Sequence, residues 1–292
     1  MKRPEKQPNA IEISQKSMAL NLLLSLVKLA AGLLASSSAM ISDAIHSASD
    51  VVSTLMVIVS VKLSSKKADA DHEYGHERME SLAALLLSVL LVLTGLWIGY
   101  SGLKSLESAS RGELSAPGVA ALAAAVLSIV VKEWMFRMTR RAANALHSSA
   151  LMADAWHHRS DALSSIGSLV GIAAARLGFP MGDPIASLII CALIVKAGVD
   201  IFMSAAAQLT DRACDPETEA RMRNVIGAQE GVARIDLLQT RRFGAKIYAD
   251  VEIAADGSLP LREAHEIAER VHGQIEQQFP DVKHCMVHVN PA

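Results

Sequence analysis

Residues 81–103 read SLAALLLSVLLVLTGLWIGYSGL, an apolar stretch that contains no charged residue. The hydrocarbon core of a bilayer is about 30 Å thick, and about 20 helical residues cross it. The stretch therefore predicts a membrane-spanning helix, and five further segments qualify by length and composition. The six predicted spans are residues 14–36, 38–61, 80–106, 116–137, 148–177 and 183–208.

The composition of the 292-residue chain also favours a membrane protein. Hydrophobic residues make up 51% of the sequence but aromatic residues only 4%, and the mean hydropathy is +0.29. The net charge of -2 gives no reason to expect a nucleic-acid partner, and no nucleotide-binding motif occurs. Cys191, Cys214 and Cys285 form no CxxC pair, which argues against a disulfide framework.

The distribution of Lys and Arg between the predicted loops sets the orientation. Cytoplasmic loops of membrane proteins carry the excess of these residues. If the polar segment 1–13 is a cytoplasmic tail, the outside loops hold only Lys104, Arg111 and Arg176. We therefore expect a multi-pass protein of a bacterial inner membrane with both termini in the cytoplasm. Lys28 and Lys196 lie inside predicted spans. Their side chains either extend to the membrane surface, line a polar interior or have a functional role.

The composition changes after residue 208, and residues 209–292 predict a small α+β domain. Asp215 and Pro216 form an N-cap and first-turn signature ahead of a helix. Two alternating strands, joined through Gly244, are followed by an amphipathic helix and a last strand. The fold class is thus a six-helix all-α membrane domain, residues 14–208, with a cytoplasmic domain of ferredoxin-like order αββαβ and helices on one side of its sheet.

Two of the predicted spans each carry a histidine and an aspartate four residues apart. SDAIHSASD contains His46 and Asp50, and DAWHHRSD contains His157 and Asp161. Residues at this spacing share one helix face. One ionisable residue at membrane depth can be a structural hydrogen-bonding group, but two matching pairs favour a metal or proton site. Two imidazoles and two carboxylates form a tetrahedral set suited to zinc.

Three polar residues near these pairs have other expected roles. His158 is turned by about 100° from His157 around the helix and is expected to face elsewhere. Asp43 and Asp154 are either accessory carboxylates or polar groups at helix ends, and we favour the second role.

The connection between the second and third predicted spans contains His72-Glu73-Tyr74-Gly75-His76, which matches the HExxH pattern of zinc proteases. An intramembrane metalloprotease would bind zinc through both histidines and use Glu73 as its general base. The motif lies in a short charged connection, however, and Gly75 weakens the helix that it requires. No third ligand motif follows, so the protease remains the remote alternative.

Taken together, SDAIHSASD, DHEYGHERMESLAALL and DAWHHRSDALSS, followed by a short αββαβ tail, resemble the cation diffusion facilitator family of divalent metal transporters. The resemblance extends over nearly the whole chain. It implies a transport site on the second and fifth helices. It also implies a second metal site in the loop between the second and third helices, as in some members of the family. The alternative is that the histidines of this loop simply face solvent. Arg78 and Asp211 match a pair that ties the dimer of the family together. The implied ligands are His46, Asp50, His157 and Asp161 for transport, and Asp69, His72 and His76 for the loop.

The resemblance also implies that the tail dimerises and binds metal between protomers. The matching positions are Asp236, Asp250, His265 and His288, to which His284 is added because it shares a face of the last strand with His288. Zinc-binding relatives carry His at the first two positions and some carry an acid at the position of Asn290, so the sequence departs from them. Each of these residues can equally be an ordinary surface group. Cys285 faces the opposite way and is expected in the core.

These observations lead to a functional hypothesis. We expect not an enzyme but a homodimeric exporter in the lipid bilayer that exchanges Zn²⁺ for protons. Metal binding requires neutral imidazoles and ionised carboxylates, so protons compete for the same atoms. Fe²⁺, Mn²⁺, Cd²⁺ and Co²⁺ remain alternative substrates, and a metal-sensing scaffold remains an alternative from another class.

Overall fold

The computed structural model describes residues 9–34, 38–110, 119–176 and 182–292. The chain divides into two compact units, residues 1–205 and 206–292. Most of the predicted N-terminal tail, residues 1–13, lies outside the described residues, and the first helix begins at Ala10.

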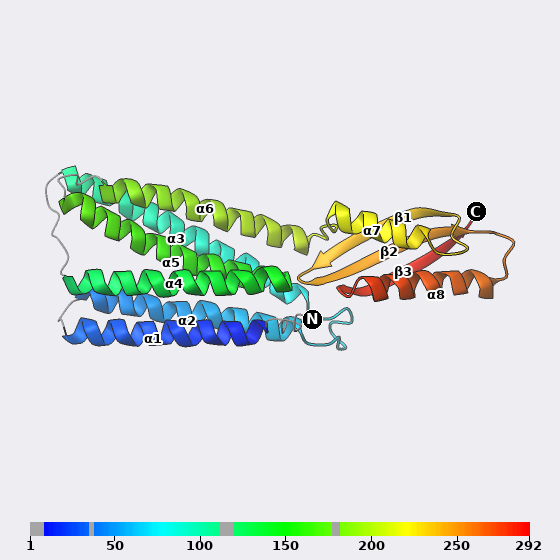
Figure 1. The fold of residues 1–292 in the computed structure, drawn as a ribbon, viewed down its shortest axis with the longest axis horizontal. Helices are drawn as coiled ribbons and strands as arrows, with labels where there is room; N and C mark the ends of the chain where they lie inside the picture. The colour runs from blue at the N-terminus through cyan, green and yellow to red at the C-terminus, as the bar shows by residue number, and fades with distance from the viewer. Residues whose placement is uncertain (1–8, 35–37, 111–118, 177–181) are drawn as a thin grey trace, which may run out of the picture. The chain divides into compact units, whose positions relative to one another are not determined.

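Six long helices, α1 to α6, lie side by side in the first unit (Figure 1). Helix α2 contacts α1, α3 and α5, and α5 in turn contacts α4 and α3. The two helices that carry the His/Asp pairs are therefore central neighbours in the bundle. The helix bounds are α1 Ala10–Leu34, α2 Ser38–Ser64, α3 Arg78–Ser110, α4 Val119–Leu146, α5 Ser149–Arg176 and α6 Gly182–Leu209.

Helix α4 continues well beyond the predicted span 116–137, because the sequence that follows is rich in good helix formers such as Ala and Arg. It ends where His147 adopts a positive φ of 51°. The hydroxyl of Ser148 then accepts a hydrogen bond from the backbone N–H of Leu151 at 3.2 Å and caps α5. The turn between α4 and α5 is therefore tight.

The bundle buries several polar residues and exposes many large apolar ones. Asn21, Asp50 and Lys132 are each at most 2% exposed, whereas Leu93 and Trp97 are 57% and 68% exposed. Such a surface is favourable against lipid and costly against water. Among the described residues, Arg78–Lys104 and Ser187–Leu209 are long and apolar enough to span a membrane, and the count of six spans stays a prediction.

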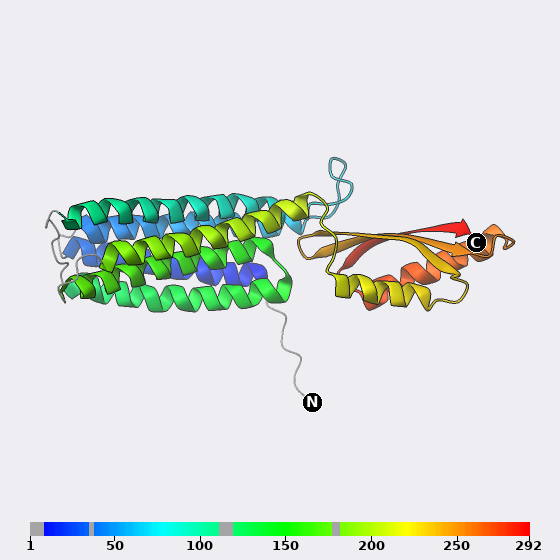
Figure 2. The same cartoon turned by 90° about the horizontal axis from the view of Figure 1, so that it is seen from above.

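The second unit contains helix α7 (Pro216–Gly227), strands β1 (Arg234–Phe243) and β2 (Lys246–Ala255), helix α8 (Leu261–Gln278) and strand β3 (Val282–Pro291). The sheet order is β1-β2-β3, with β1 antiparallel and β3 parallel to β2. Both helices lie on one face of this sheet (Figure 2). The αββαβ order is therefore as predicted, while the ferredoxin-like assignment stays a prediction.

Local sequence signals explain where these elements begin and turn. The carboxylate of Asp215 accepts hydrogen bonds from the backbone N–H of Thr218 at 2.9 Å and from its hydroxyl at 2.8 Å. These bonds hold the pKa of Asp215 below its ordinary value. Pro216 opens α7, and Gly244, with φ 56°, closes the β1–β2 hairpin. The predicted cap and hairpin are both confirmed.

Candidate metal sites

A buried cluster of Asp50 on α2 with His157 and Asp161 on α5 lies inside the helix bundle. One ligand atom from each residue lies within 4.8 Å of the others. His157 Nε2 lies 3.1 Å from Asp50 Oδ1, and the side chains of Asp50 and Asp161 are 2% and 9% exposed. The structure thus brings together three of the four predicted transport ligands. The fourth, His46, lies one turn before Asp50 on α2, but its side chain is outside the described residues, as is that of Asp43.

Lys132 on α4 completes this cluster, and the sequence analysis missed it. Its ammonium donates hydrogen bonds to Asp50 Oδ2 at 2.6 Å, Asp161 Oδ2 at 2.8 Å and Asn21 Oδ1 at 2.9 Å. An ammonium has three donors, and here all three are used. A lysine in the predicted span 116–137 was the available signal, because an ionisable residue at membrane depth points to function.

A second group of polar side chains is buried beside the cluster. The carboxylate of Asp154 accepts a hydrogen bond from the hydroxyl of Thr54 at 3.3 Å and lies 3.5 Å from the ring of His158. His158 Nε2 in turn lies 2.7 Å from Ser17 Oγ on α1. The preferred helix-end role for Asp154 was therefore wrong, because this residue is fully buried between helices. His158 faces away from the metal cluster, as predicted.

The predicted loop ligands also lie together. Asp69 Oδ1 is 3.4 Å from His72 Nδ1, and Asp69 Oδ2 is 3.5 Å from His76 Nε2. The two imidazole centroids are 4.5 Å apart, and one donor atom from each residue lies within 4.8 Å of the others. Three such donors with an open position match a common zinc count.

The loop owes this arrangement to its backbone and to a neighbouring lysine. Asp69 accepts a hydrogen bond from the backbone N–H of His72 at 2.9 Å and another from the Lys66 ammonium. The hydrogen bond from Lys66 is the main reason why the pKa of Asp69 lies far below its ordinary value. Residues 69–77 form turns in place of a helix, and Gly75 has φ 96°. The HExxH pattern therefore lacks the helical turn that a metalloprotease needs.

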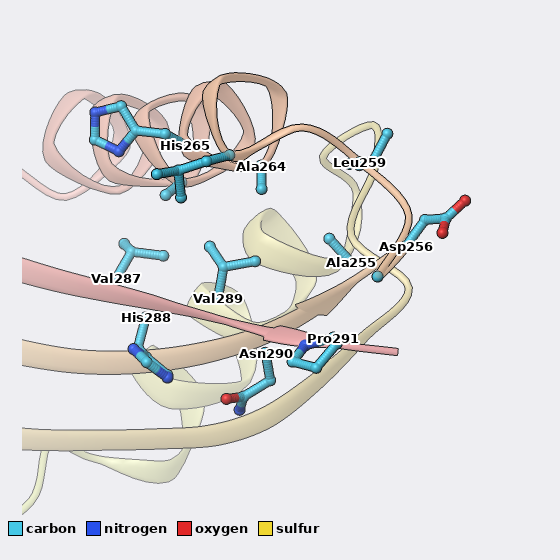
Figure 3. Close-up of a pocket in the computed structure, with 13 residues that line it drawn as sticks. Ala255, Asp256, Leu259, Ala264, His265, Val287, His288, Val289, Asn290 and Pro291 are labelled. Carbon is cyan, nitrogen blue, oxygen red and sulfur yellow. The ribbon is translucent and has the colours of Figure 1, made fainter.

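The five predicted tail ligands are spread over the second unit. His265 on α8 and His288 on β3 border one pocket, but their rings point away from one another (Figure 3). His284 and His288 face outward from β3, while Val287 and Val289 face α8. Among the described residues of this unit, no three such donors come within 4.8 Å of one another. A metal site made within one protomer thus has no preformed geometry, and the site between protomers stays a prediction.

The outer sheet face engages two of the acidic candidates in other contacts. Asp236 Oδ2 accepts a hydrogen bond from Asn290 Nδ2 at 3.0 Å, which with Arg234 lowers the pKa of Asp236. Asp250 lies 3.8 Å from the guanidinium of Arg241. On the inner face, burial raises the pKa of the Cys285 thiol to about 12, so the prediction of a core cysteine is confirmed.

The two residues of the predicted dimer interlock belong to different compact units. Arg78 begins α3, and Asp211, with φ 60°, follows α6. Their pairing stays a prediction.

Two family profiles match nearly the whole chain. One, described as the cation efflux transmembrane domain, matches residues 15–210. The other, described as the cytoplasmic domain of cation efflux proteins, matches residues 214–292.

Several full-length proteins are similar to the chain. Metal tolerance protein C1 of Arabidopsis thaliana is 36% identical over 282 residues, which cover 92% of this chain but only 60% of the plant protein. Manganese efflux system protein MneP of Bacillus subtilis is 30% identical over 294 residues and 98% of each chain. Magnetosome protein MamB of Magnetospira sp. is 31% identical over 261 residues, covering 89% of this chain and 88% of that protein.

One solved structure is similar to part of the chain. MamM-CTD 215-293 is 24% identical and has a TM-score of 0.26, covering 26% of this chain and 96% of that one.

Proposed function

The chain belongs to the cation diffusion facilitator family, whose members are multi-pass membrane transporters of divalent metals and not enzymes, and from this premise we propose that it exports Zn²⁺ in exchange for protons. The family assignment removes the metalloprotease alternative. The domain of residues 14–208 carries out transport through six membrane spans, and the domain of residues 209–292 regulates it.

The buried cluster of Asp50, His157 and Asp161 is the observation that carries this proposal. Its donor atoms come from two central helices and lie within 4.8 Å of one another, away from the apolar outer surface. Zinc takes nitrogen and oxygen ligands at about 2.0–2.2 Å, so modest side-chain shifts suffice to bring the three onto one ion. His46, one turn from Asp50, supplies the fourth ligand.

Manganese is the second candidate substrate. Imidazoles suit zinc, whereas carboxylates suit manganese, and the cluster contains both. The similarity to a protein named as a manganese efflux system, over 98% of both chains, favours Mn²⁺ specifically. Fe²⁺, Cd²⁺ and Co²⁺ remain further alternatives for the same site.

Proton exchange follows from the chemistry of the ligands. A metal ion binds neutral imidazoles and ionised carboxylates, so it displaces protons when it arrives from the cytoplasm. Protons that enter from the other side then compete for the same nitrogen and oxygen atoms and release the metal. Alternating access of one site to the two sides converts this competition into antiport.

The remaining predictions are part of the same proposal. The protein is a homodimer in a bacterial inner membrane, with the N-terminal tail and the C-terminal domain in the cytoplasm. Arg78 and Asp211 tie the dimer together. A second metal binds in the loop at Asp69, His72 and His76, and a regulatory metal binds between the tails.

Transport by purified protein in liposomes tests the proposal. A metal-sensitive dye and a pH dye are enclosed, and Zn²⁺ is added outside with and without a proton gradient. We expect saturable zinc entry coupled to proton exit, which falls by about 100-fold or more in Asp50→Ala because a ligand of the site is lost. Parallel runs with Mn²⁺, Fe²⁺, Cd²⁺ and Co²⁺ rank the substrates. Folded dimer that moves none of these ions would contradict the transport function.

A further inference from the structure

We propose that Lys132 is an internal competitor of the transported metal, whose ammonium holds Asp50 and Asp161 until a divalent cation takes both carboxylates. The inference rests on the proposed transport site. In addition to the metal ligands on α2 and α5, the site then contains the ammonium of Lys132 on α4, which helps to determine specificity.

The surroundings of Lys132 are built for an ammonium ion. The side chain is 1% exposed, and its nitrogen lies 2.6 and 2.8 Å from one oxygen of each carboxylate. Asn21, a neutral residue on α1, provides the third acceptor at 2.9 Å. Helices α1, α2, α4 and α5 thus each contribute one or more members of a single buried group.

Contacts next to Lys132 fix its place against α5. Glu133, the following residue, accepts a hydrogen bond from Arg159 on α5 and another from Arg137 on its own helix at 2.8 Å. The ring of Phe136, one turn further on α4, lies 5.9 Å from that of Trp156 on α5. The approach of Lys132 to Asp161 is therefore part of a formed α4–α5 interface.

The ammonium and a divalent metal compete for the same two carboxylates. A zinc ion binds carboxylate oxygen at about 2.0–2.2 Å. It would then lie within a few ångströms of the ammonium, even if it took the other oxygen of each carboxylate. Like charges repel strongly at such separations in a poorly polarisable interior. The flexible four-carbon stem of Lys132 lets the ammonium withdraw, and Asn21 offers a neutral acceptor that it can keep.

This competition weakens metal binding and assists release. A free cation in solution competes only in proportion to its concentration, whereas a tethered one is always present at high effective concentration. The carboxylates are never left without a positive partner as the metal departs. Lys132 therefore lowers metal affinity to a level at which the ion can leave.

A zinc-binding measurement tests the proposal. The full-length protein is placed in lipid nanodiscs, and its zinc binding is measured by equilibrium dialysis at mildly alkaline pH. The transport-site component is the part lost in Asp50→Asn. We expect Lys132→Met to bind zinc about tenfold more tightly at the transport site. A tenfold change in the dissociation constant corresponds to a moderate change in binding free energy. Lys132→Arg, which keeps the charge, should bind like wild type. The control is Lys196→Met, since Lys196 also pairs with an aspartate, Asp200, at 2.7 Å but on the exposed side of α6.

A second readout separates competition from a structural role. Zinc should raise the melting temperature of Lys132→Met more than that of wild type, because the metal replaces the missing charge. If Lys132→Met does not fold, Lys132→Gln removes the same charge and carries the same expectation. Unchanged or weaker zinc binding in a folded neutral variant would overturn the proposal. Tighter binding in that variant without zinc flux in wild type would overturn only the transport function.

Discussion

Among the described residues, two groups of three Asp and His side chains could hold a metal ion, and they lie in opposite settings. In each, a lysine donates to an aspartate that faces histidine: Lys132 to Asp50 in the bundle, and Lys66 to Asp69 in the loop. The bundle cluster is assembled from distant parts of the sequence and is almost inaccessible. The loop cluster comes from one short segment, and Lys66 and Asp69 are 56% and 31% exposed.

The difference in burial decides what each lysine does. A buried charge that loses its partner is strongly destabilising, whereas an exposed ion pair contributes little because water and salt screen it. The bundle cluster therefore couples metal chemistry to the packing of four helices. The Lys66–Asp69 pair of the loop cluster is partly exposed, so its loss should cost little stability.

Loss of a bundle carboxylate is expected to give the largest effect. Asp161→Asn removes a proposed metal ligand and one acceptor of Lys132, and zinc flux in liposomes should fall by about 100-fold or more. Asp200→Asn, an exposed change on α6, is the matched control and should transport like wild type. Flux close to wild type in Asp161→Asn would remove this residue from the transport site.

The stability of variants that lack Lys132 or Lys66 tests the comparison of the two clusters. Lys132→Met removes the ammonium that two buried carboxylates share, and breaking such a buried ion pair costs about 3–5 kcal/mol. The metal-free melting temperature should fall clearly, and the double variant Lys132→Met/Asp50→Asn should recover part of the loss. Lys66→Met should show no measurable change in the same thermal unfolding experiment. Equal losses for the two lysines would contradict the distinction drawn from burial.

The loop histidines test whether the second cluster is separable from transport. The double variant His72→Ala/His76→Ala should bind one metal ion fewer per protomer, measured by elemental analysis after dialysis. Its zinc flux should stay within about threefold of wild type, since no ligand of the bundle cluster is touched. A loss as large as that in Asp161→Asn would place the loop on the transport path.

Loss of the N-cap of α7 is expected to have a small effect on stability, and this effect should depend on pH. Asp215→Ala should weaken the start of α7 by about 1 kcal/mol, measured by hydrogen exchange of the first-turn amides. Because the folded pKa of Asp215 lies below its unfolded value, the stabilisation is complete above about pH 3.9 and is lost as the pH falls through the folded pKa. In Asp215→Ala this acid-dependent change should disappear.

The sequence predicted features that depend on local spacing. His157 and Asp161 were identified because they lie one helical turn apart, whereas the loop ligands were identified from the resemblance to a family in which some members bind metal there. Lys132 was missed because its partners are on other helices. The spacing of residues within one segment does not predict which helices pack against each other. Asp154 was misplaced because its hydrogen-bond partner Thr54 lies on another helix, although His158 is only four residues away on its own helix.

Lys132 also has an electrical consequence. Moving one elementary charge through 100 mV is worth about 2.3 kcal/mol. With two ionised carboxylates and one ammonium, the metal-free site carries one negative charge, whereas without the ammonium it carries two. With the same number of protons bound, the returning metal-free transporter therefore carries one positive charge more than it would without this lysine. The charge of a single residue on α4 thus changes how strongly a membrane potential acts on the proposed site.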